Sequence, residues 1–282
     1  MIISKKGNWA LKLVQRDKKK VKTIHIFFIT MCFHSFVFGA SESLESLLMK
    51  RNGSSFPSYE SIGVILNAHQ NTQMDYTMNF RQSNHHIHIA VSSNATASYL
   101  SMDTNFNVLS STFNVTESSL IEKINYTTRI AQRNELDEVL FTFFKNKKLI
   151  KKKGVYYTKN TLDTFSIIPV LQHISSLNAP LIHAEFSVQH MAIRVPVIIE
   201  QSTNSSLTPF LSRYTVPEEL LGMIDNESGY TVYTLKVTGW QGLIYNHRHY
   251  YVFSAESPYF YVGHWGGPDQ TNLFSWSLRL NR

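Results

Sequence analysis

The sequence predicts a mainly β protein, in which an antiparallel curved sheet or open half-barrel has one helix packed against it. Apolar and polar residues alternate with a period of two in much of the range 75–280. Turn residues separate most of these runs by only a few positions, which favours antiparallel meanders over βαβ units. Only the segment 163–178 shows a long apolar stripe at helical spacing. A chain of 282 residues with 43% hydrophobic residues is long enough to bury a substantial core.

The N-terminal leader, residues 1–40, is predicted to be a signal peptide. A basic stretch ends at Lys22, and residues 24–39 contain no Asp, Glu, Lys or Arg. This apolar run is shorter than the roughly 20 residues that a comfortable membrane span needs. Small residues follow it directly, so we expect cleavage and a mature N-terminus between Ala40 and Glu42. An N-terminal anchor that is not cleaved is the alternative.

The charge distribution gives no reason to expect a nucleic-acid partner. The net charge is +7, but residues 1–23 hold eight basic residues and one acidic residue, so the rest of the chain is neutral. The only cysteine, Cys32, lies in the leader, which leaves the mature chain without disulfides or thiol chemistry. We therefore expect an exported protein of a bacterial envelope, in the periplasm or associated with the outer membrane.

Between the leader and the main domain, residues 41–61 are predicted to form a short helix and a polar linker. Leu44, Leu47 and Leu48 share one face of that helix, and Ser, Asn and Gly are frequent after it. The β-rich domain is then expected to cover residues 62–282.

The strands of this domain are predicted from alternation and from the turn residues between them. Ser83-Asn84 is predicted to be a hairpin turn between two alternating runs. Further strands are expected at 97–102, 105–115, 120–132, 137–144, 149–158, 181–189, 192–200, 230–239, 248–255, 258–264 and 272–280.

The segment 163–178 is predicted to be the helix that packs on the sheet. Asp163, Thr164 and Ser166 are candidate N-caps, and Asn178 and Pro180 end the helix. Its apolar stripe is expected to cover part of the concave face of the sheet, and consists of Ile167, Val170, Leu171, Ile174 and Leu177. Its other surface is expected to be polar, with Gln172, His173, Ser175 and Ser176. A second, short helix is predicted from Thr215 to Gly222.

Two segments resemble an exported bacterial family known as domain of unknown function 3108. They are the aromatic run 250–260, which continues to Gly266-Gly267-Pro268, and the helix opening 163–168. The resemblance covers about 75–280 and implies a β-rich domain in the periplasm or at the outer membrane, with no known catalytic residues. The arrangement of sheet and helix is also similar to the half-barrel of lipoprotein carriers.

Aromatic residues dominate the C-terminal third, and core packing is their default role. The alternative is a ligand groove between the concave sheet and the helix, because such grooves favour apolar walls with a few polar groups. The candidate residues for this groove are Tyr251, Phe253, Tyr259, Tyr261, Leu171 and Ile174.

Two pairs of histidines are weak candidates for metal ligands. On extended strands, His86 and His88 share one face, and so do His247 and His249. No Asp or Glu stands at ligand spacing beside either pair, so we expect solvent-facing histidines, no metal and no cofactor.

No local signature of an enzyme is present: there is no nucleophile elbow, zinc-protease helix, phosphate loop or carboxylate pair. We therefore predict a non-catalytic exported domain that binds an apolar or amphipathic envelope ligand, or a partner. The alternatives are a hydrolase acting on cell-envelope polymers and a structural or adhesive surface module.

A run of lysines marks the turn between two predicted strands. Six lysines fall between Lys145 and Lys153. Such a basic loop suits contact with the anionic headgroups of a membrane or an envelope polymer. The alternative is a solvated turn that also discourages aggregation through a sheet edge.

Overall fold

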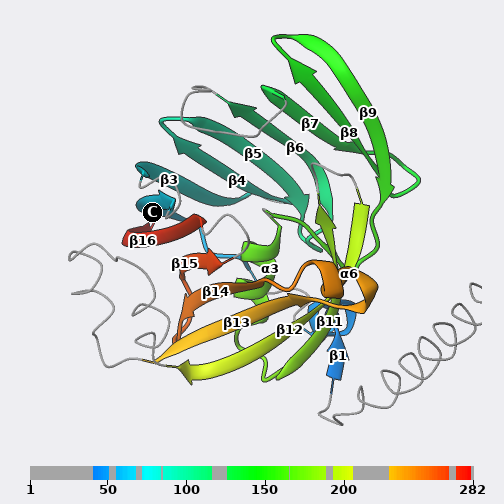
Figure 1. Ribbon diagram of the computed structural model, residues 1–282. Coiled ribbons are helices and arrows are strands. Elements are labelled where there is room, and N and C mark those ends of the chain that lie inside the picture. The colour runs from blue at the N-terminus through cyan, green and yellow to red at the C-terminus, as the bar shows by residue number, and fades with distance from the viewer. Residues whose placement is uncertain are drawn as a thin grey trace, which may run out of the picture. The chain divides into compact units, whose positions relative to one another are not determined.

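The computed structural model describes residues 41–50, 55–67, 72–83, 85–115, 126–164, 166–188, 193–205, 229–266 and 271–280 (Figure 1). Residues 40–282 form one compact unit. The predicted signal peptide and the helix predicted at 215–222 lie outside the described residues. In the ranges that the structure describes, no helix has the length and apolar character that crossing a bilayer requires.

Strands make up most of the described chain, which confirms the predicted fold class. They are β1 (Ser41–Ser43), β2 (Tyr59–Asn67), β3 (Thr72–Ser83), β4 (His86–Ser93), β5 (Thr96–Asp103), β6 (Val108–Val115), β7 (Thr128–Arg133), β8 (Glu138–Lys145), β9 (Lys148–Tyr156), β10 (Thr161–Leu162), β11 (Leu181–Val188), β12 (Ile193–Ser205), β13 (Tyr230–Val237), β14 (Arg248–Ser254), β15 (Tyr261–Gly266) and β16 (Thr271–Leu280).

One continuous sheet contains all of these strands. Except for β10, they follow the order β1-β11-β12-β13-β14-β15-β16-β2-β3-β4-β5-β6-β7-β8-β9. Two meanders, β2 to β9 and β11 to β16, are joined where β16 pairs antiparallel with β2. The short strands β1 and β10 both pair parallel with β11. Because strands twist, a sheet of this size curls, and Figure 1 shows it curving around the helix α3.

The helix α3 (Ile167–Ile174) lies inside this curve, and all eight of its residues are buried. Asp163 and Ser166 bond to each other in the turn that leads into α3: the backbone N–H of Ser166 donates to Asp163 Oδ1 (2.8 Å), and that of Asp163 donates to Ser166 Oγ (2.8 Å). The predicted helix is therefore confirmed over the shorter range Ile167–Ile174, and its N-cap is Ser166, one of the three candidates.

The predicted polar surface of α3 was wrong in one respect, because Gln172, His173 and Ser175 are buried rather than exposed. The sheet supplies the missing partners. Tyr59 Oη donates to Gln172 Oε1 (2.8 Å), and Gln172 Nε2 donates to the carbonyl oxygen of Pro258 (3.0 Å). Buried polar groups are tolerated when they are hydrogen-bonded, so α3 is held by specific contacts as well as by apolar packing.

The start of the domain differs from the predicted boundary at residue 62. The helix α2 (Leu44–Lys50) exists as expected, but its Leu44 and Leu47 belong to the main core. Phe56 and Tyr59 are also in that core, and β2 begins at Tyr59, within the range predicted to be linker. The range 50–61 was predicted to be linker because its composition is polar, but its two aromatic residues, Phe56 and Tyr59, are buried in the core.

One further helix, α6 (Gly239–Ile244), connects β13 to β14 and was not expected from the sequence. Its two glycines are poor helix formers, which explains why it has no clear sequence signal. None of its residues is buried.

Candidate functional site

A buried polar cluster surrounds Asp163, at the N-terminal end of α3. Asp163 is only 1% exposed, and Arg129 of β7 is only 4% exposed. Three tyrosines and a serine complete the group, which we call the Asp163 cluster: Tyr126, Arg129, Tyr157, Asp163, Ser187 and Tyr251.

The fold explains how residues so far apart in the chain meet. After β9, at one end of the strand order, the chain passes through Tyr157 and enters β10, which pairs with β11 near the other end. Asp163 follows β10 directly and Ser187 lies on β11. The cluster therefore lies where the two ends of the curved sheet approach each other.

Arg129 supplies a positive charge to this interior. Its guanidinium carbon lies 5.7 Å from the centre of the Phe113 ring, over the ring face. Burial lowers the pKa of Arg129, while Tyr126 and the negative charge of Asp163 raise it. An arginine remains protonated under such opposing influences, so the cluster contains a buried cation.

The phenols of the cluster are neutral hydrogen-bond donors at physiological pH. Burial raises the pKa of Tyr157 well above its ordinary value, and the charge of Asp163 raises it further, against the effect of Ser187. Burial is also the main cause of the raised pKa values of Tyr126 and Tyr251. Arg129, Tyr157 and Tyr251 therefore lie near the Asp163 carboxylate, and Tyr126 lies beside Arg129.

Two histidines extend the cluster along β14 and β15. Tyr245 Oη lies 2.9 Å from His249 Nε2, and His249 Nδ1 lies 3.2 Å from His264 Nε2. The His264 ring stacks on Tyr251, with ring centres 4.4 Å apart. We call Tyr245, His249 and His264 the histidine chain.

Both imidazoles of the histidine chain are neutral at pH 7. Burial lowers the pKa of His249 to about 4, with a further contribution from His247. Burial likewise lowers the pKa of His264 to about 3, with a further contribution from His249. A neutral imidazole can accept as well as donate a hydrogen bond, so the chain can hold or transfer a proton.

The groove candidates are brought together by the structure. Leu171, Ile174, Tyr251, Phe253 and Tyr261 are all buried in one core. Tyr259 packs against that core and is only partly buried. The structure therefore places these residues together in the packed core, and a ligand groove among them stays a prediction.

The predicted histidine pairs lie apart, since β15, β16, β2 and β3 separate β14 from β4 in the strand order. The rings of His247 and Tyr245 meet edge to face, at an interplanar angle of 70°. His249 is hydrogen-bonded to His264, so His247 and His249 do not form a pair of metal ligands. Over the residues that the structure describes, no three His, Cys, Asp or Glu side chains are grouped to hold a metal ion.

Sequence reasoning missed His264, Arg129 and Asp163 as site residues. A strand was predicted at 258–264, with His264 as its last residue, whereas β15 spans Tyr261–Gly266 and places His264 opposite Tyr251. The alternation of the sequence gives the strand, but it does not give this register between β14 and β15.

Replacing His86 and His88 together with Gln is expected to change the free energy of unfolding by less than about 0.5 kcal/mol. His86 is exposed, and His88 makes its contacts at the surface, with Tyr99 Oη (2.6 Å) and Ser83 Oγ (3.3 Å). Urea unfolding and metal analysis of both proteins check this. Stoichiometric zinc or copper that the double variant loses would contradict it.

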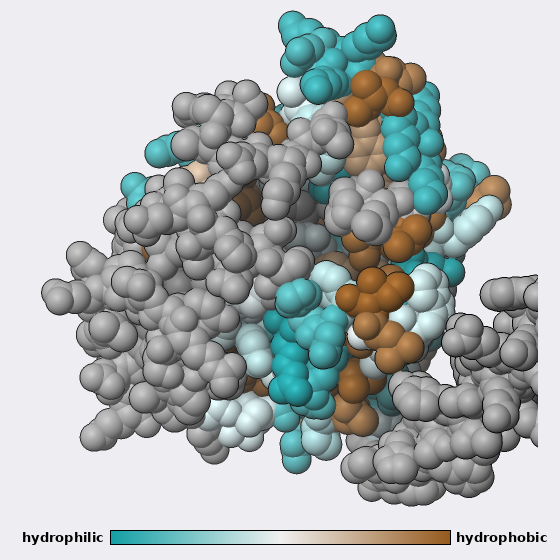
Figure 2. All heavy atoms as spheres, in the orientation of Figure 1, coloured by the Kyte–Doolittle hydropathy of each residue, from teal (hydrophilic) through white to brown (hydrophobic). Residues whose placement is uncertain are grey.

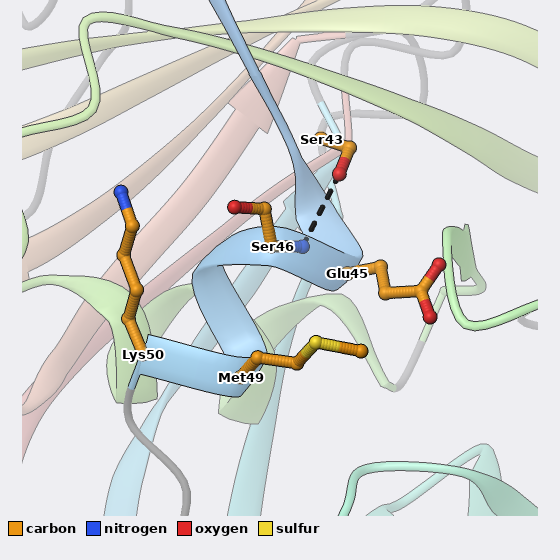
Figure 3. A pocket seen from close by; sticks show the side chains of 5 residues that line it. All are labelled: Ser43, Glu45, Ser46, Met49 and Lys50. Carbon is orange, nitrogen blue, oxygen red and sulfur yellow. Dashed lines mark hydrogen bonds between the residues drawn. The ribbon is translucent and has the colours of Figure 1, made fainter.

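A separate surface pocket of about 510 Å³ lies on β1 and α2, lined by Ser43, Glu45, Ser46, Met49 and Lys50 (Figure 3). Its charged side chains have partners, because Lys50 pairs with Glu42 and Glu45 pairs with Lys159. The lining residues come from one short segment, so this pocket lacks the converging polar groups that the Asp163 cluster provides.

The fold places this protein in the class of barrel-like β-domains, in which a strongly curved, mainly antiparallel sheet surrounds a helix. No protein-family model and no curated protein matches the sequence, so the resemblance to domain of unknown function 3108 is not confirmed. A solved structure is similar: the crystal structure of a β-barrel-like protein of domain of unknown function DUF1849 from Brucella abortus. The match has a TM-score of 0.51 and 7% sequence identity, and covers 81% of this chain and 99% of that one. At this identity the likeness supports the fold alone.

Proposed function

We propose that this protein is an exported, non-catalytic domain that binds an amphipathic molecule with an anionic head on the concave side of its sheet. The observation that carries the proposal is the Asp163 cluster, in which Arg129 is buried within an aromatic interior. Asp163 offsets the charge of Arg129, and a planar guanidinium with five N–H donors can bind a second carboxylate or a phosphate beside it. The phenols of Tyr126 and Tyr157 add neutral donors beside it.

The apolar part of such a ligand suits the residues next to the cluster. Tyr251 belongs both to the Asp163 cluster and to the predicted groove, and Phe253 and Tyr261 continue the aromatic wall. Ligand sites typically combine apolar walls with a few polar groups that fix one end of the molecule. An acyl chain along this wall, with its head at Arg129, fits that pattern.

The proposed location is the periplasm or the outer membrane, on the basis of the basic and apolar leader. The Lys145–Lys153 loop is the proposed point of membrane contact. Its lysines are exposed on the β8–β9 hairpin, as are Leu149 and Ile150. Because β9 ends the strand order, these lysines also suit the protection of a sheet edge.

Native mass spectrometry of the protein recovered after export from a bacterial host tests the proposal. We expect a mature chain that begins between residues 40 and 42 and carries an additional lipid-sized mass. The Arg129→Gln variant is expected to lose this mass, and added oleate is expected to bind at least about tenfold more weakly to it. Arg133→Gln is the matched control, because Arg133 lies on the same strand and pairs with the exposed Asp137.

If Arg129→Gln fails to fold, Tyr157→Phe removes one donor of the cluster with little change of shape. A wild-type protein that carries no additional mass and binds no oleate would contradict ligand binding. Equal oleate affinity in wild type, Arg129→Gln and Tyr157→Phe would contradict the proposed position of the head. An intact Met1 on a membrane-bound protein would contradict cleavage.

A hydrolase acting on cell-envelope polymers is the second candidate, and the histidine chain favours it. The neutral imidazole of His249 can accept a proton as a general base, and its pKa of about 4 makes it a weak one. Turnover of ester or glycoside substrates that is lost in His249→Gln, with the fold retained, would support the enzyme in place of the binding domain.

A further inference from the structure

The helix α6 exposes three large apolar side chains that contribute nothing to the core. Trp240, Leu243 and Ile244 are 67%, 68% and 79% exposed. They lie within a six-residue helix of which no residue is buried. Figure 2 shows hydrophobic residues at the position that α6 occupies in Figure 1. Exposed apolar residues gathered on one element indicate an interaction surface rather than a packing requirement.

The helix is presented in a fixed way. Backbone N–H groups of Gly242 and Tyr245 donate to the carbonyls of Thr238 and Gln241, at 3.3 and 2.8 Å. Thr238 ties the start of α6 to β12, because its backbone N–H donates to the carbonyl of Pro196 (2.9 Å).

Gly242 brings the helix unusually close to the end of β13. A Cβ atom at this position would lie 2.5 Å from the carbonyl oxygen of Val237, so only glycine fits. At the other end, Tyr245 is anchored through its hydroxyl to His249 (2.9 Å). The apolar side chains therefore project from a structured tip.

The charged residues before and after α6 in the sequence indicate which kind of partner surface the helix can contact. The stretch 229–255 contains Lys236, Arg248, His247 and His249 but no Asp or Glu. Lys236 pairs with Glu200, whereas Arg248 and His247 are exposed just after the helix. Apolar residues with a tryptophan, next to an exposed arginine and in a stretch without acidic residues, match the interface of a bilayer that contains anionic lipids.

We propose that α6 docks the protein on an anionic lipid bilayer by inserting Trp240, Leu243 and Ile244 into the headgroup region. This docking surface is separate from the Lys145–Lys153 loop and does not depend on ligand binding in the interior. Its position gives it a direct link to the interior, because Tyr245 follows α6 and begins the histidine chain that reaches Tyr251.

Tryptophan fluorescence of the full chain tests this docking at the helix itself. The spectrum of the Trp240→Phe variant is subtracted from that of the wild type, so that the difference reports Trp240 alone. Vesicles contain phosphatidylethanolamine and phosphatidylglycerol, with some acyl chains brominated to quench nearby tryptophans. We expect a blue shift of the Trp240 contribution and quenching by the brominated lipid, both weaker with phosphatidylcholine alone.

The double variant Leu243→Ser/Ile244→Ser is expected to lose this quenching, with vesicle affinity at the helix reduced at least about tenfold. Leu136→Ser is the matched control, because Leu136 is 74% exposed in the β7–β8 turn and should change nothing. The variants remove no buried group, so melting temperatures should agree with the wild type.

Three outcomes would overturn the proposal. The first is Trp240 fluorescence that brominated vesicles leave unchanged. The second is vesicle binding that Lys151→Gln/Lys152→Gln abolishes while the α6 double variant binds normally. The third is a dimer of the wild type that the α6 double variant converts to a monomer, because α6 would then contact a second copy of the chain.

Discussion

Replacing Leu171 with Ala is expected to lower the free energy of unfolding by about 2–5 kcal/mol. Leu171 is fully buried in the middle of α3, inside the curve of the sheet. Because its neighbours are closely packed, they cannot move far enough to fill the cavity that the smaller side chain leaves. Urea unfolding followed by circular dichroism measures the difference.

The control for this prediction is Leu243→Ala, which removes the same group from an exposed position on α6. Its free energy of unfolding should stay within about 0.5 kcal/mol of the wild type. An unchanged melting temperature of Leu171→Ala would mean that α3 leaves the sheet readily in solution, as a lid would, and that the packed arrangement is wrong.

Stability is expected to fall by about 4–6 kcal/mol between pH 7 and pH 4 because of the histidine chain. Burial lowers the pKa values of His249 and His264 in the folded protein to about 4 and about 3, from an ordinary value of 6.5. In the unfolded chain both imidazoles take up protons near pH 6.5. As the pH falls below this value the unfolded state gains protons first, so the folded state loses stability.

Unfolding in urea at a series of pH values checks this expectation. The double variant His249→Gln/His264→Gln should show a shallower loss of stability between pH 6.5 and pH 4, because glutamine does not titrate. His86→Gln/His88→Gln should follow the wild-type profile, since these side chains lie near the surface of β4. Parallel profiles for the wild type and His249→Gln/His264→Gln would show that other groups cause the acid sensitivity.

The local patterns of the sequence were sufficient for most of the strands and for α3. Strand β14 was expected at 248–255 and spans Arg248–Ser254, and β5 was expected at 97–102 and spans Thr96–Asp103. These elements alternate cleanly or repeat at helical spacing, and their neighbours in the sheet are their neighbours in the chain.

The elements that the sequence did not reveal depend on distant contacts. The Asp163 cluster forms only because the two-residue strand β10 pairs with β11, and so short a strand has no periodicity. Gln172 was predicted to be exposed because it is polar and has no partner nearby in the sequence; the residue that donates to it, Tyr59, lies 113 residues away. Burial of polar residues of this kind follows from tertiary structure and leaves no local pattern.

The pairing of β16 with β2 has a consequence for the order of folding. Leu280 lies opposite Tyr59, so the contact that joins the two meanders spans nearly the whole domain. Each meander can assemble from neighbouring strands, but their union must wait until the last ten residues of the sheet are available. Closing such a large loop has a high entropic cost, which makes this step the natural kinetic bottleneck. Until it is complete, β2 and β15 each present an open edge, and the nascent domain is most exposed to association with other chains at that stage.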